Sequence, residues 1–162
     1  MGAYETAVPG MDHHKSITSV IYDFPVTKLE YHASQIDWPI ALNAYYARVF
    51  KFFLFNATQE HLFRIDELET TQLAALSINI PQGIVNNSIE WGQEVANATI
   101  NYSEEDQEGS SQSRVARPTS YFPPAGDGLW TPTTPDYGNA MFPYWGRVKT
   151  FAAGSDDLLS PP

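Results

Sequence analysis

The chain has 162 residues, of which 43% are apolar and 14% aromatic, and its formal net charge is −10 at pH 7. This length and composition are typical of one globular domain and exclude an intrinsically disordered chain. The acidic balance argues against binding to a nucleic-acid backbone, which requires clustered lysine and arginine. Because the chain has no cysteine, disulfides, thiolate metal sites and cysteine nucleophiles are excluded.

The sequence predicts neither a targeting segment at its N-terminus nor a membrane-spanning helix. Residues 1–5 have no basic stretch followed by an apolar run, so we expect no signal peptide. The longest apolar run, residues 49–55, is interrupted by Lys51 and is far shorter than the ~20 residues of a spanning helix. We therefore expect a soluble chain.

Residues 1–16 are mixed and polar, contain the turn signal Pro9-Gly10 and predict a flexible N-terminal arm.

Residues 17–107 predict a helical region. Its β-branched start, residues 17–22, predicts a short strand or an extended segment packed on a helix. The first clear helix begins at Asp37, a suitable N-cap, with Pro39 in its first turn. Apolar residues then recur at three- and four-residue spacing, and residues 50–55 are apolar on the other side as well. Such a helix belongs at the centre of its bundle, and we expect it to expose apolar surface that three helices cannot cover.

Two more helices follow in the predicted helical region. Residues 56–58 form a break, after which Thr58 caps a second, short helix that extends to about Leu68. Residues 77–81 are a connection, and a third helix covers residues 82–105 with Trp91 on its buried stripe. Its acidic end opposes the helix dipole, so we expect fraying there.

Residues 108–162 begin with a hydrophilic link, 108–113, and continue as a segment rich in tryptophan and proline. The predicted fold is therefore all-α, a helical bundle portion followed by a long irregular segment. So long a structureless stretch is unusual in a self-contained small domain and indicates a fragment of a larger fold.

Four stretches in a fixed order carry a resemblance to a known family. They read Asp-Trp-Pro-Ile-Ala-Leu from residue 37, Ser-Ile-Glu-Trp-Gly-Gln-Glu-Val-Ala from 88, Asp-Gly-Leu-Trp-Thr-Pro-Thr-Thr-Pro from 127, and Pro-Tyr-Trp-Gly-Arg-Val-Lys-Thr-Phe from 143. With them, residues 33–162 resemble the N-terminal part of bacterial proteins related to vanadium-dependent haloperoxidases and type 2 phosphatidic-acid phosphatases. The sequence departs from the family pattern at Thr134 and Thr150, where proline is commoner.

The resemblance implies an all-helical bundle that oxidises halide on bound vanadate or hydrolyses phosphoesters in the same oxyanion pocket. The family's catalytic set is a lysine, two arginines, a Ser-Gly-His element and a further histidine, all C-terminal to the Trp/Pro segment. No Ser-Gly-His occurs in these 162 residues. No catalytic, cofactor-binding or metal-binding role is therefore assigned to a residue of this chain, and vanadate or phosphate is implied only for the complete enzyme.

Histidine and acidic residues are candidates for metal or acid–base chemistry. The Asp12-His13-His14 run predicts a metal site or, more simply, exposed histidines in an arm. His32 and His61 lie near or on helices, and His61 beside Glu60 is a candidate acid or base, although a partly exposed helix histidine is the plainer interpretation. The acidic run 104–106 suits calcium or a solvated helix end.

Basic and aromatic residues of the C-terminal segment are the other candidates. A phosphate or vanadate pocket needs several converging cations, and the candidates are Arg114, Arg117, Arg147 and Lys149. The family comparison makes Arg147 and Lys149 scaffold or pocket rim. Trp130 and Trp145 line a substrate groove or, as we expect, anchor the segment by packing.

The leading functional hypothesis is the non-catalytic N-terminal portion of a vanadium-haloperoxidase-like or acid-phosphatase-like enzyme. Its partner would be the missing C-terminal catalytic portion or a second chain that carries it, and a homo-oligomer is also possible. The alternatives are a stand-alone helical binding or scaffold protein and a small helical enzyme that uses His61. Family members are often exported, so the resemblance leaves the localisation open.

Overall fold

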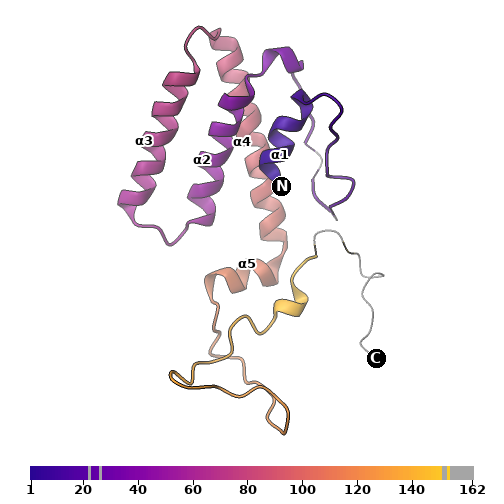
Figure 1. The fold of residues 1–162 in the computed structure, drawn as a ribbon, viewed down its shortest axis with the longest axis vertical. Coiled ribbons are helices and arrows are strands. Elements are labelled where there is room, and N and C mark those ends of the chain that lie inside the picture. Colours follow the sequence, from indigo (N-terminus) through magenta and orange to yellow (C-terminus); the bar gives the residue numbers. More distant parts are fainter. Residues whose placement is uncertain (22, 26, 151–152, 154–162) are drawn as a thin grey trace. The chain divides into compact units, whose positions relative to one another are not determined.

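The computed structural model describes residues 1–21, 23–25, 27–150 and 153. In this part of the chain the fold is all-α, as the sequence predicts, and it contains no strand. The α-helices are α1 (Gly2–Ala7), α2 (Trp38–Phe53), α3 (Gln59–Leu76), α4 (Gln82–Glu105) and α5 (Gln107–Arg114) (Figure 1). Three short 3-10 helices are η1 (Val8–Gly10), η2 (Ala33–Gln35) and η3 (Trp145–Arg147). The chain forms two compact units, one of Met1–Tyr102 and the other of Ser103–Phe151.

The predicted N-caps of α2 and α3 are confirmed. The Asp37 carboxylate accepts a hydrogen bond from the backbone N–H of Ile40 at 3.1 Å. The Thr58 hydroxyl accepts one from the backbone N–H of His61 at 3.3 Å. Each cap satisfies a backbone donor that has no partner within the helix. Helix α3 continues to Leu76, well beyond the expected end near Leu68.

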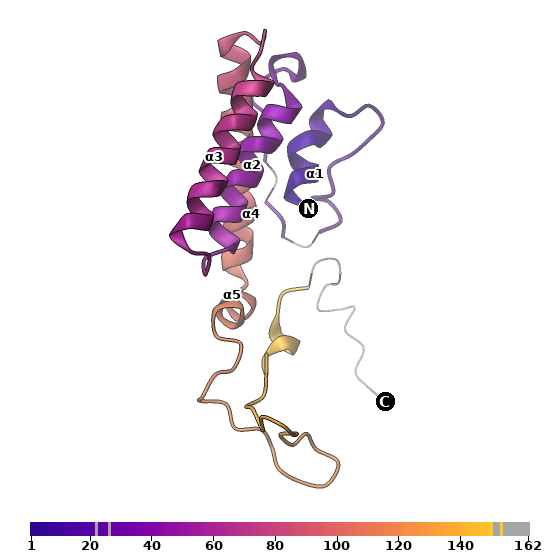
Figure 2. The same ribbon diagram turned by 60° about the vertical axis from the view of Figure 1, so that its left-hand side comes forward.

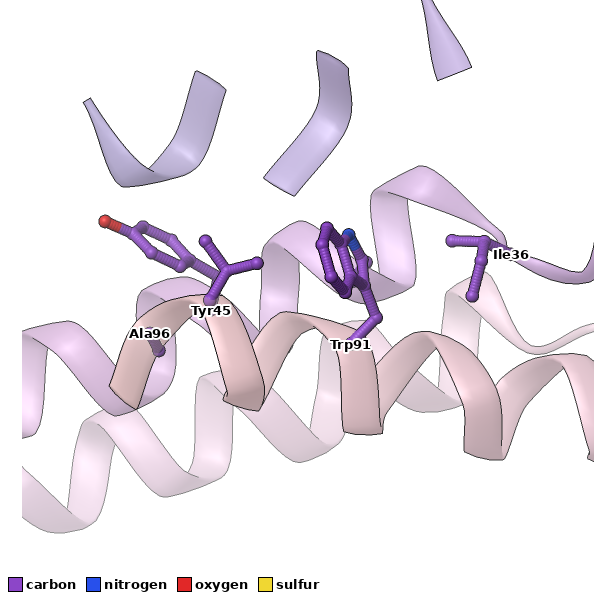
Figure 3. Close-up of a cluster of buried hydrophobic side chains, with 6 residues drawn as sticks. Ile36, Tyr45, Trp91 and Ala96 are labelled. Atoms are coloured by element: carbon purple, nitrogen blue, oxygen red, sulfur yellow. The ribbon is translucent and has the colours of Figure 1, made fainter. Parts of the chain in front are cut away.

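Helix α2 lies between α3 and α4, the central position that its all-round apolar character predicts (Figures 1 and 2). Its buried side packs on α4 in a cluster that joins residues from both helices and the segment before them: Ile36, Ala41, Tyr45, Trp91, Val95 and Ala96. Figure 3 shows the rings of Tyr45 and Trp91 pointing to the same side of the two helices. The indole N–H of Trp91 donates to the backbone carbonyl of Thr6 in α1 at 2.8 Å.

Residues 1–16 differ from the expected flexible arm. They contain α1 and η1, and Thr6 in α1 is fully buried. The buried carboxylate of Glu5 accepts hydrogen bonds from the Ser16 hydroxyl and the Ile17 backbone N–H, both at 2.8 Å. The physical reason for the difference is a tertiary contact. The backbone carbonyl of Thr6 accepts the hydrogen bond that the buried Trp91 indole N–H requires.

The β-branched residues from Ile17 onward form a turn instead of a strand. The backbone N–H groups of Val20 and Ile21 both donate to the carbonyl of Ile17, at 2.9 and 3.0 Å. Residue 22, the last of the expected strand, lies outside the described residues.

The unit Ser103–Phe151 begins with a helix where a hydrophilic link was expected over 108–113. The Asp106 carboxylate accepts from the backbone N–H of Gly109 at 3.2 Å and so caps α5. An irregular chain follows over 115–144 and returns to this helix, because the Gln112 side-chain oxygen accepts from the Tyr144 backbone N–H at 3.0 Å. Gln112 is the one buried side chain among the described residues of this unit.

Candidate functional site

The candidate histidines lie on the surface and are not brought together. His13 and His14 are exposed, and the His14 ring is 2.8 Å from the backbone carbonyl of Asp12. The His61 ring is 3.1 Å from the Thr58 hydroxyl, at the start of α3. His32 is exposed where η2 begins. This distribution offers no shared pocket in which one of them would act as a general base.

Within the described residues, no group of three or more histidine or acidic side chains is placed to hold a metal ion. At the acidic end of α4, Glu104 and Glu105 are exposed, as expected for a solvated helix end. Glu105 also pairs with Lys149 at 3.6 Å, and Asp106 caps α5. No described helix is both long and apolar enough to cross a membrane.

The four candidate cations do not converge on one point. Arg147 lies 3.8 Å from the Glu108 carboxylate and also stacks over the Tyr144 ring, 5.2 Å from its centroid. Lys149 is neutralised by Glu105. Arg117 is exposed, and no ion pair of this residue is found in the described part of the chain. Two cations that face carboxylates and one that borders a cavity provide fewer free charges than an oxyanion pocket needs.

Arg117 borders an open cavity of about 440 Å³ within the C-terminal unit. Its guanidinium lies against Gly138, 3.1 Å from the position that a Cβ at this glycine would occupy. The other lining residues come from the following irregular chain: Trp130, Thr133, Thr134, Pro135, Asp136, Asn139, Ala140 and Met141. Because Asp136 also lines the cavity, its lining carries charges of both signs.

The tryptophans of this unit differ from the expected packing anchors. Trp145 is 66% exposed and Trp130 is 49% exposed. Large apolar side chains are exposed throughout the same unit, and Phe122 reaches 84%. The remaining members of this exposed set are Val115, Leu129, Tyr137 and Met141. We call residues 115–145 the aromatic segment; it presents apolar surface without an apolar core of its own.

A second apolar surface lies between α2 and α3 in the N-terminal unit. This groove, of about 420 Å³, is lined on α2 by Pro39, Leu42, Asn43, Tyr46, Ala47 and Phe50, and on α3 by Ile65, Leu68, Glu69, Gln72 and Leu76. The expected exposure of apolar surface at the end of α2 is confirmed, because Phe50, Phe53, Leu54 and Phe55 are all exposed.

Two electrostatic contacts in the N-terminal unit were not identified from the sequence. Lys51 of α2 pairs with Asp66 and, at 3.1 Å, with Glu69, both on α3. These hydrogen bonds raise the pKa of Lys51 above its ordinary value, Asp66 contributing most. The sequence signal for this contact was the position of Lys51 within the longest apolar run, where a charged side chain needs a partner.

The other contact joins the segment before η2 to α4. The Tyr31 hydroxyl donates to the Glu90 carboxylate at 2.6 Å, and this bond is the main cause of the raised pKa of Tyr31. Burial raises the pKa of the neighbouring Glu94, and the charges of Glu30 and Glu90 raise it further. Tyr31 and Glu90 are 59 positions apart in the chain, so no local sequence pattern predicts their hydrogen bond.

No family model matches this chain, and neither a curated protein nor a solved structure is significantly similar to it. The family resemblance therefore depends on the four stretches of sequence, and the function depends on what the described surfaces can do.

Proposed function

We propose that this chain is the non-catalytic helical portion of a vanadium-haloperoxidase-like or acid-phosphatase-like enzyme. It packs against a catalytic helical bundle formed by residues other than these 162 and shapes the entrance to the oxyanion site. Vanadate or phosphate binds to that bundle and not to a site within this chain.

The observation that carries the proposal is the exposure of the aromatic segment. Four of its aromatic side chains, Phe122, Trp130, Tyr137 and Trp145, are between 49% and 84% exposed. Large exposed aromatic side chains gathered in one segment are typical of an interaction site. Burying such side chains against a partner would contribute roughly 1–2 kcal/mol each, an upper estimate from apolar area.

The backbone of the aromatic segment supports the same role. A hydrogen bond connects its two ends, in which the Phe142 backbone N–H donates to the Ala116 carbonyl at 2.8 Å. Together with the bond between Tyr144 and Gln112, this contact closes the segment into a loop that leaves Phe122, Trp130 and Tyr137 exposed. A loop that is already closed loses less conformational entropy when it docks.

Arg117 is the residue of this chain that we expect nearest to the anion. Arg147 and Lys149 are occupied by Glu108 and Glu105, whereas the Arg117 guanidinium faces an open cavity. A single cation at the entrance would attract an anionic substrate without binding it tightly.

The experiment is purification of the tagged chain from cells that naturally produce it, followed by assays of the eluate. The assays are phosphoester hydrolysis and vanadate-dependent bromide oxidation. The proposal predicts activity in the wild-type eluate and none in the chain freed of its partner by denaturation and refolding. A Trp130→Ala/Trp145→Ala variant should lose the activity, and a Val20→Ala variant, changed at an exposed residue of the other unit, should retain it. An inactive wild-type eluate, or activity in the refolded chain alone, would contradict the proposal.

A stand-alone helical scaffold is the second candidate, and one observation favours it. The N-terminal unit has a buried core of its own around Trp91 and Val95, so it does not need a partner to exclude water from these residues. The scaffold hypothesis predicts that the natural complex contains no polypeptide with either enzymatic activity.

A further inference from the structure

The groove between α2 and α3 is a second exposed apolar surface, formed by residues other than those of the aromatic segment. We propose that it is a homodimer interface, in which the α2–α3 hairpins of two copies pack as an antiparallel four-helix bundle. This inference goes beyond the proposed function, because it depends on α2 and α3 and not on residues 103–151.

The first support is the presence of two apolar faces on α2. Ala41, Ala44 and Tyr45 lie on its buried face. Pro39, Tyr46 and Phe50 recur on the other side and line the groove, and Phe53 follows at the next turn of the same stripe. Helix α3 has no buried residue at all, so its groove-lining side chains Ile65, Leu68 and Leu76 still lack a covering element. An amphipathic helix is normally stabilised by covering such a stripe.

The second support is the size of this face. Four large side chains of this face are each about half exposed: Tyr46, Phe50, Phe53 and Leu68. For side chains of this size, half exposure corresponds to a solvent-accessible area of ~100 Å² each. With the partly exposed residues of the same groove, the apolar face is roughly 500 Å² in each copy. Two copies would then bury about 1,000 Å² in total, the lower limit for a specific protein interface.

The third support is the low charge of the residues that line the groove. Its one charged lining residue, Glu69, is paired with Lys51 of the same copy at 3.1 Å. The amide of Asn43 is also engaged, since it donates to the Glu69 backbone carbonyl at 2.9 Å. Lys51 also pairs with Asp66, so one carboxylate charge in each copy remains beside the groove. Two copies of a chain with net charge −10 would oppose fewer like charges at this largely apolar face than elsewhere on an acidic surface.

The shape of the face suits a two-fold arrangement. The rings of Tyr46 and Phe50 are stacked, with centroids 5.5 Å apart and an interplanar angle of 23°. They form part of the groove wall on α2, and a two-fold axis would place this pair of rings in each copy over α3 of the other. The groove extends for about three helical turns, roughly 16 Å, which is sufficient for near-antiparallel helix packing.

The test is sedimentation of the complete chain over a range of micromolar to near-millimolar concentrations, with two matched variants on α3. Leu68→Glu places a charge in the groove. Phe63→Glu makes the same kind of change at a residue with similar exposure, 61% against 56%, about 140° around the helix. We expect the wild type to form a dimer and Phe63→Glu to retain it. In Leu68→Glu the dissociation constant should rise at least about 100-fold, because the two-fold symmetry places the new charge in the interface twice.

A labelling experiment keeps the proposal testable if Leu68→Glu fails to fold. The chain has no native cysteine, so a pyrene on Phe53→Cys should give excimer fluorescence that depends on concentration, and a pyrene on Phe63→Cys should not. A monomeric wild type would overturn the proposal, as would equal effects of the two glutamate variants. Dimers that persist in Leu68→Glu, or a different polypeptide on this face in the natural complex, would also overturn it.

Discussion

Gly92 of α4 lies directly against the backbone carbonyl of Ala41 in α2, so close that a Cβ at position 92 would overlap this oxygen. The contact sets how closely the two central helices of the N-terminal unit approach each other. Because the neighbouring atoms belong to backbone, they cannot move aside as a flexible side chain can.

Gly92→Ala is therefore expected to destabilise the protein, although alanine normally favours a helix over glycine. Separating the helices should cost about 1–3 kcal/mol, more than the gain in helix propensity. Gly83→Ala, on the same helix with open space around it, should leave stability unchanged or raise it by up to about 1 kcal/mol. Thermal unfolding followed by circular dichroism measures both changes, and equal stability of the two variants would contradict the close packing.

Trp91→Phe should destabilise the N-terminal unit by about 2–3 kcal/mol. The change removes the indole N–H that donates to Thr6, leaves a buried carbonyl without its partner and creates a small cavity. Trp145→Phe, at an exposed position, should change stability by less than about 0.5 kcal/mol. Urea unfolding measures the difference, and a Trp91→Phe protein as stable as the control would show that α1 is not docked through this bond.

Lys51→Met should destabilise the α2–α3 hairpin by about 0.5–1 kcal/mol, because Asp66 and Glu69 both lose their partner in a half-exposed setting. The folded state raises the pKa of Lys51, so its contribution is complete below the ordinary lysine value and is lost only as the pH rises above it. Arg64→Met removes an exposed pair with Glu60 and should cost no more than about 0.5 kcal/mol. Urea unfolding at neutral pH that ranks Arg64→Met as the more destabilising change would contradict this assignment.

Glu94→Gln should raise stability at neutral pH. Folding raises the pKa of Glu94, so the folded state is favoured when this carboxyl is protonated and is weakened as the pH rises from its ordinary value of 4.5. The variant should melt at the same temperature as the wild type in acid and slightly higher at neutral pH, by a few tenths of a kcal/mol for a largely exposed group. Glu67→Gln, an exposed charge on α3, is the control, and an equal gain in both would indicate a general effect of net charge.

Local signals predicted the main helices because local chemistry forms them. Asp37 and Thr58 cap their helices through bonds to residues three positions ahead, and such spacing is visible in any sequence. Helix α5 was missed because Gln-Glu-Gly-Ser-Ser-Gln-Ser-Arg has no apolar stripe. Its N-cap at Asp106 was the one available signal.

The unpredicted features depend on residues distant in the chain. The bond between Trp91 and Thr6 spans 85 positions, so nothing within residues 1–16 indicates that they fold. The exposure of Trp130 and Trp145 was missed for a related reason. Their aromatic character predicts burial, but a residue type alone does not say which other part of the protein, if any, packs on it, and both side chains are exposed.

Hydrogen exchange across residues 115–145 tests the central proposal most directly, in the purified chain and in the natural complex. If the aromatic segment docks on a catalytic bundle, its amides exchange rapidly in the chain alone, become protected in the complex, and remain unprotected in Trp130→Ala/Trp145→Ala. Amides of α4 around Val95 should be protected in every sample. Strong protection of the segment in the isolated chain, or no added protection in the complex, would contradict the account.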